Sequence, residues 1–146
     1  HKMSTWEGGI RVPAIIRWPG RIPAGKVTGQ VGITMDLTAS VLAVAGAPLP
    51  ADLHLDGMNL FPILEGRAPE VERTLFWRSH PARPTRAVRS GDWKLVLEPR
   101  AMLFDLRNDI GERENLIGRH PEVARRLRAL LRQWEDDVGS AAPAAR

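Results

Sequence analysis

Cysteine is absent from this chain of 146 residues. Without a thiol, the chain cannot form a disulfide, hold a metal through thiolates or use a cysteine nucleophile. Long apolar runs are absent as well, because no segment approaches the roughly 18 consecutive apolar residues that a membrane-spanning helix needs. The sequence therefore predicts no membrane partner.

Blocks of like charge are also missing. The net charge is +4, but the basic residues, nearly all Arg, are spread along the chain without a run of five or more. The densest group, at 125–132, lies on an apparent amphipathic helix, where a solvated face is the ordinary interpretation. Proteins that bind single strands interleave aromatic and basic side chains, whereas the Trp residues here are scattered. We therefore expect no nucleic-acid partner, and a non-catalytic Arg-rich binding module is kept as an alternative function.

The composition that remains is typical of a folded protein, with 43% hydrophobic and 26% charged residues. In the first half, an apolar run rich in β-branched residues predicts a strand at 12–18, and a weaker strand follows at 30–34. Asp36 is a plausible N-cap for a helix that ends at Gly46. No hairpin pairs these strands, and a lone apolar strand usually belongs to a larger sheet. Residues 1–66 are therefore predicted to be the end of an α/β domain whose other strands are missing.

The second half has a different pattern. After a polar boundary at 67–73, four short segments predict strands, and Ser-Gly-Asp at 90–92 predicts a hairpin between the second and third. A helix is expected from Pro121, with an apolar stripe at helical spacing. Residues 67–138 are thus predicted to form an antiparallel sheet of three or four strands packed by a C-terminal helix, and 139–146 a disordered tail. The predicted strands are 74–77, 86–89, 93–97 and 102–106.

The order of motifs resembles the C-terminal part of a sulfatase. The motifs are K-x-x-x-W-E-G-G-I-R-V-P at 2–13, D-L-T-A-S-V-L-A-V-A-G at 36–46, L-D-G-x-x-L-x-P-I-L-E-G at 55–66, A-V-R-S-G-D-W-K-L-V at 87–96 and L-F-D-L-R-N-D-I-G-E-R-E-N-L at 103–116. Each motif is weak, but their order and short spacings make the resemblance specific over residues 2 to about 136. One departure is Ala39-Ser40, where the family often has Pro-Thr, and we interpret it as a change in packing.

The resemblance implies an arylsulfatase-like member of the alkaline-phosphatase-like superfamily. It implies an α/β catalytic domain followed by a small subdomain, which makes the present region α+β by itself. It also implies hydrolysis of sulfate monoesters by a formylglycine made from Cys or Ser, with a divalent cation, usually Ca²⁺. We expect this chain to be a C-terminal portion of such an enzyme, inactive alone and binding neither cofactor by itself. A phosphonate or phosphodiester hydrolase of the same superfamily is the alternative enzyme.

Lys2 matches the family's active-site Lys. A compact ammonium with three donors suits a sulfate oxygen and the leaving oxygen, where negative charge develops. His1 is adjacent and is a weaker candidate for the substrate pocket. Glu7, with Gly8 and Gly9, either lies near the substrate or forms a tight or positive-φ turn in which Glu7 pairs or caps locally.

Two other groups of residues resemble functional motifs but fit them poorly. Residues 79–83, Ser-His-Pro-Ala-Arg, match the bare formylglycine pattern. We reject Ser79 as the nucleophile precursor, because the family's motif opens a helix far upstream of the Lys, whereas a strand follows here. Asp109, Glu112 and Glu114 lack the order of a Ca²⁺ loop and predict a turn instead, so no metal ligand is expected in this chain.

Overall fold

The computed structural model describes residues 4–50, 52–79 and 85–140. It divides the chain into two compact units. The first combines the N-terminal segment, up to Pro13, with everything from Arg73 onward, and the second is Ala14–Glu72. Each unit is described by itself. The boundary predicted between residues 66 and 67 stays a prediction.

The first unit is built on a four-stranded antiparallel sheet, with the strands in the order β1-β2-β3-β4. The register places Val88 opposite Leu95, and Leu95 opposite Leu103, so that the apolar side chains align across three strands. Gly91 has a φ of 58° in the turn between β2 and β3, which explains glycine in the predicted hairpin. The strands are β1 (Thr74–Arg78), β2 (Arg86–Ser90), β3 (Trp93–Glu98) and β4 (Arg100–Asp105). The predicted sheet is confirmed.

One face of the sheet packs against helix α4 (Pro121–Ser140). The helix presents the predicted apolar stripe, of which Leu127 and Leu131 are fully or almost fully buried. An ion pair between Arg86 of β2 and Glu135, 3.2 Å apart, joins sheet and helix further along. The helix continues through Ser140, so the prediction that the tail begins at residue 139 is wrong by two residues. Residues 141–146 lie outside the described part.

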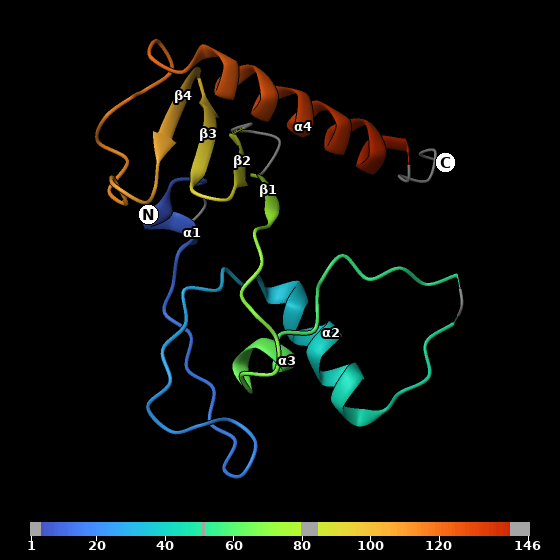
Figure 1. Cartoon of the computed structure of the whole chain (residues 1–146). Coiled ribbons are helices and arrows are strands. Elements are labelled where there is room, and N and C mark those ends of the chain that lie inside the picture. The colour runs from blue at the N-terminus through green and yellow to red at the C-terminus, as the bar shows by residue number, and fades with distance from the viewer. Residues whose placement is uncertain (1–3, 51, 80–84, 141–146) are drawn as a thin grey trace. The chain divides into compact units, whose positions relative to one another are not determined.

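The opposite face of the sheet is covered by the N-terminal segment. Because side chains alternate along a strand, Ala87, Val96 and Phe104 point away from α4 and form a second buried cluster. Trp6 packs against this cluster, directly before the one-turn helix α1 (Glu7–Ile10). Figure 1 shows α1 and α4 on different sides of the sheet. The sheet thus has a buried core on both faces.

The second unit contains α2 (Thr34–Ala45) and α3 (Phe61–Leu64). Asp36 is not the N-cap residue, because the helix begins two residues earlier. Its buried carboxylate reaches back to accept hydrogen bonds from the N–H of Ile33 (2.7 Å) and of Met58 (2.9 Å). Gly46 ends α2 as predicted, with a φ of 61°.

The segment at 57–60, which belongs to the L-D-G motif, packs against the first half of α2. A Cβ at Gly57 would lie 2.2 Å from the Met35 carbonyl oxygen, so only glycine fits where this turn packs against α2. Ser40 accepts a hydrogen bond from the N–H of Leu60 (2.9 Å), and Ala39 is buried. The interpretation of the Ala39-Ser40 departure as a change in packing stays a prediction.

The strands predicted at 12–18 and 30–34 do not form. Within the described residues of these segments the backbone is irregular, and apolar side chains are left in solvent: Val12 is 77% exposed and Ile15 is 94% exposed. A strand needs a neighbour to satisfy its backbone N–H and C=O groups. No strand in the described part of the chain pairs with either segment, so the β propensity is not realised here. Gln30 is instead joined to the backbone of Val71 by its side-chain amide.

We predict that Leu127→Ala destabilises the first unit by about 2–5 kcal/mol, because it leaves a cavity between α4 and the sheet. Urea unfolding followed by Trp fluorescence measures the change. Arg128→Ala, on the exposed side of the same helix, is the matched control and should stay within about 0.5 kcal/mol. Equal stability of Leu127→Ala and the unmodified chain would contradict the assigned core.

Candidate functional site

A buried lysine between two carboxylates lies on the face of the sheet that α1 covers. Lys94 of β3 is 0% exposed. Its Nζ atom lies 2.7 Å from Oε1 of Glu7 and 2.8 Å from Oε1 of Glu112, and both glutamates are buried. We call these three residues the Lys94 cluster. It connects the N-terminal segment, the sheet and the loop before α4.

Local sequence explains why the lysine is inside. Lys94 and Val96 alternate with Leu95 along β3, so they share the face opposite α4. An ammonium buried there without partners would lose its hydration, a cost that is prohibitive unless opposite charges replace the water. Glu7 and Glu112 supply those charges. Removing one partner of such a buried pair typically costs about 3–5 kcal/mol.

Glu112 adopts an unusual backbone conformation to take part. Its φ is 53°, the sole positive value among the described non-glycine residues. The left-handed region costs such a residue roughly 1–2 kcal/mol. The loop is held in place by Asn115, whose Oδ1 accepts from the Leu103 N–H of β4 (3.0 Å). Asp109 closes the turn by accepting from the N–H groups of Arg113 and Glu114. This is the turn predicted before the last helix, although the buried role of Glu112 was not predicted.

Glu7 is held at two points. Besides the contact of its carboxylate with Lys94, its backbone N–H donates to Oε2 of Glu112 at 2.6 Å. The expectation that Glu7 pairs or caps locally is wrong, since Lys94 is 87 residues away. Gly8 and Gly9 lie in the single turn of α1, where the Gly9 N–H donates to the Trp6 carbonyl at 2.8 Å, so the tight turn is present. Neither glycine has a positive φ, so that alternative is wrong.

Trp6 adds a second attachment for the same segment. Its Nε1–H donates to Oε2 of Glu98 at 2.9 Å, and its ring lies 5.3 Å from that of Phe104. Thr5 is also buried. Three consecutive residues, Thr5 to Glu7, are thus held against the sheet by burial, ring packing and charge.

The predicted site residues Lys2 and His1 lie outside the described residues. Ser79 follows the end of β1, where its Oγ accepts from the N–H of Thr85 (3.1 Å) and faces the Thr85 hydroxyl at 2.9 Å. Residues 80–84, which complete the Ser-His-Pro-Ala-Arg pattern and lead to β2, lie outside the described part. The rejection of Ser79 as a nucleophile precursor therefore stays a prediction. In the described ranges no three His, Asp or Glu side chains are grouped so that they could hold a metal ion.

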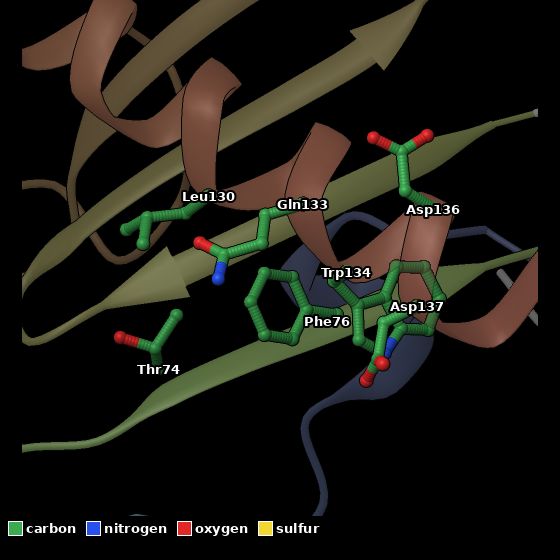
Figure 2. A pocket seen from close by; sticks show the side chains of 7 residues that line it. All are labelled: Thr74, Phe76, Leu130, Gln133, Trp134, Asp136 and Asp137. Atoms are coloured by element: carbon green, nitrogen blue, oxygen red, sulfur yellow. The ribbon is translucent and has the colours of Figure 1, made fainter.

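A groove of about 650 Å³ lies between β1 and the last turns of α4. Figure 2 shows Phe76 and Trp134 side by side in it, and their rings are stacked at 5.2 Å. The side chains that line it include Asp136 and Asp137 but no cation. A site for an anionic sulfate ester needs positive charge or aligned N–H donors, so this groove does not fit one.

Two glutamates of the second unit have lowered pKa values. Hydrogen bonds from the Thr28 hydroxyl and the Gly29 N–H lower the pKa of Glu70. Burial acts to raise the pKa of Glu65, but hydrogen bonds from Arg67 and Arg21 outweigh it and lower the pKa. Both groups therefore favour their charged form and hold loops of this unit together.

Sequence reasoning missed the Lys94 cluster. One member of the cluster had a signal in the sequence. Lys94 lies within the apolar strand segment W-K-L-V-L, at a position that side-chain alternation assigns to a buried face. Its partners carried no comparable signal, since Glu7 and Glu112 lie in polar segments where exposed glutamate is the ordinary expectation.

No described helix is long and apolar enough to cross a membrane.

A family model described as "N-sulphoglucosamine sulphohydrolase, C-terminal" matches residues 1–137. Bovine (Bos taurus) arylsulfatase A is 35% identical over 161 residues, covering 92% of this chain and 31% of the relative. N-acetylgalactosamine-6-sulfatase of Sus scrofa is 48% identical over 77 residues, covering 52% of this chain and 14% of the relative. This chain thus spans about a third or less of these relatives' length.

Solved structures agree. One, described under glycosaminoglycan metabolism by Bacteroides thetaiotaomicron, has a TM-score of 0.76 and 27% identity, covering 92% of this chain and 31% of that chain. Another, solved in complex with its substrate D-glucosamine-2-N,6-O-disulfate, has a TM-score of 0.70 and 23% identity, covering 88% and 29%, and shows the shared fold. The match over residues 1–137 and these relatives confirm the resemblance found in the motifs: the chain belongs to the sulfatase family and corresponds to its C-terminal region.

Proposed function

We propose that residues 1–146 serve as the C-terminal portion of an enzyme that hydrolyses sulfate monoesters. The observation that carries this proposal is the family match over residues 1–137, which includes the K-x-x-x-W-E-G-G segment. The two relatives described above are named arylsulfatase A and N-acetylgalactosamine-6-sulfatase, and a human relative is named steryl-sulfatase. What these names share is the sulfate ester, so the proposal commits to that group and not to an alcohol.

Lys2 is proposed to contact the sulfate. Its ammonium would stabilise the negative charge that grows on the sulfate and leaving-group oxygens as the S–O bond breaks. His1 is proposed, with less support, to line the same pocket. Support for Lys2 comes from its place in the motif, three residues before the buried Thr5.

The formylglycine and the Ca²⁺ that the family implies do not fit the described residues of this chain. Cysteine is absent, Ser79 lies beyond a strand, and the buried carboxylates are occupied by Lys94 or by backbone N–H groups. We therefore propose that the rest of the enzyme supplies both, and derive no step through them. Exposed Val12, Ile15 and Val27 support a larger partner domain, because such side chains normally lie in a core.

We predict that Lys2→Ala in the complete enzyme lowers kcat/KM for 4-nitrophenyl sulfate by about 10²–10³-fold, because a charge aimed at the transition state is lost. Steady-state kinetics measures the effect. Lys26→Ala is the control, since it removes an exposed lysine whose Nζ donates to a backbone carbonyl. Unchanged turnover by Lys2→Ala would refute the role proposed for this residue.

Residues 1–146 alone are expected to release no 4-nitrophenolate from 4-nitrophenyl sulfate, because the nucleophile is proposed to lie elsewhere. A complete sulfatase assayed in parallel is the positive control. Turnover that co-elutes with the purified chain and is lost on mutation of Ser79 would overturn the proposal for the nucleophile.

The complete enzyme should prefer an aryl sulfate to the matching phenylphosphonate ester. Its family relatives are named as sulfatases, so the site is expected to favour the geometry and charge of a sulfate monoester. The ratio of kcat/KM for the two esters measures the preference. A ratio in favour of the phosphonate would support the alternative hydrolase instead.

A further inference from the structure

We infer that Lys94 is a positioning residue of the active site: with Glu7 and Glu112 it fixes Thr5 to Glu7, the residues that follow Lys2 closely in the chain. Lys94 itself does not touch the substrate in this account. The inference rests on the proposed function, because it assigns to the Lys94 cluster the task of placing the Lys2 ammonium.

The geometry supports this role through the way Glu7 is held. A residue attached by its side chain alone can still rotate about its backbone. Glu7 is attached by its carboxylate to Lys94 (2.7 Å) and by its backbone N–H to Glu112 (2.6 Å), so both its position and its orientation are set. The chain direction on leaving Glu7 toward Lys2 is therefore set as well.

Little chain separates this attachment from Lys2. Trp6 is fastened through Glu98 and Phe104, and Thr5 is buried. Only Met3 and Ser4 lie between Lys2 and the fastened residues. A group that contacts a transition state has to be held in a defined place, and attachment of the adjacent residues Thr5 to Glu7 serves that requirement.

Stability alone does not account for the cluster. Buried ion pairs often contribute no more to folding than apolar residues of the same shape would. In addition, Glu112 is held in a left-handed conformation that its side-chain role requires. The buried charges of the Lys94 cluster and the strained backbone of Glu112 all serve to hold Glu7. Orienting the segment before Glu7 explains why charged side chains lie here instead of apolar ones.

The test is a double-mutant cycle in the complete enzyme, assayed with 4-nitrophenyl sulfate well below the unfolding temperature. Lys94→Met should lower kcat by about 10–100-fold and change KM by less than about 3-fold, since alignment is lost and binding is kept. In the Lys2→Ala background the same substitution should lower kcat by less than about 2-fold. An equal loss in both backgrounds would overturn the inference.

Leu127→Ala is the matched control, because it weakens the opposite face of the same sheet without touching the cluster. It should lower the Tm and leave kcat unchanged. If Lys94→Met does not fold, Glu112→Gln tests the same point, because it keeps a side-chain acceptor for the Glu7 N–H and removes the charge. Unchanged kcat for the folded variant would also overturn the inference.

Amide hydrogen exchange separates this inference from the proposed function. Lys94→Met should speed exchange of the Glu7 N–H by at least about 10-fold relative to amides of α4, whatever the reaction catalysed. Lys2→Ala with full activity would refute the proposed function. Loss of activity in Lys2→Ala, combined with unchanged kcat and unchanged Glu7 exchange in Lys94→Met, would refute the positioning role alone.

Discussion

The first unit depends on one buried lysine and the two glutamates that pair with it. Lys94 lies inside the sheet's second core, and an ammonium stays there because Glu7 and Glu112 replace its lost hydration. Each carboxylate belongs to a segment that has no strand or long helix of its own. The requirement to neutralise one lysine therefore fastens both the N-terminal segment and the loop before α4 to the sheet.

This constraint explains why the sheet is covered on both faces. The α4 face is closed by an amphipathic helix, an arrangement that needs only apolar side chains at regular spacing. The other face has no such helix. Trp6, Phe104 and the Lys94 cluster close it with a ring contact and ion pairs instead. A short irregular segment can cover a face of a sheet when hydrogen bonds and ion pairs attach it, even though it has no regular apolar stripe to bury.

The second unit shows the opposite case. Its helices and turns form around local contacts, such as those of Asp36 and Ser40. However, Ile15 and Val27 are almost fully exposed, and among the described residues no strand pairs with the segments predicted as strands. Relatives such as arylsulfatase A are about three times longer than this chain. In a protein of that length, a larger domain would cover these exposed apolar side chains.

The sequence by itself determined the hairpin at Gly91, the four strands, the stripe of α4 and the family, because these depend on local spacing and on motifs that stand in order along the chain. It also identified Lys2 as a candidate site residue, through its place in the K-x-x-x-W-E-G-G motif. Only the tertiary structure decided that Glu7 pairs with Lys94 across 87 residues and that Glu112 turns inward. Pairing of distant charges depends on which faces meet after folding, and no periodicity along the chain encodes that.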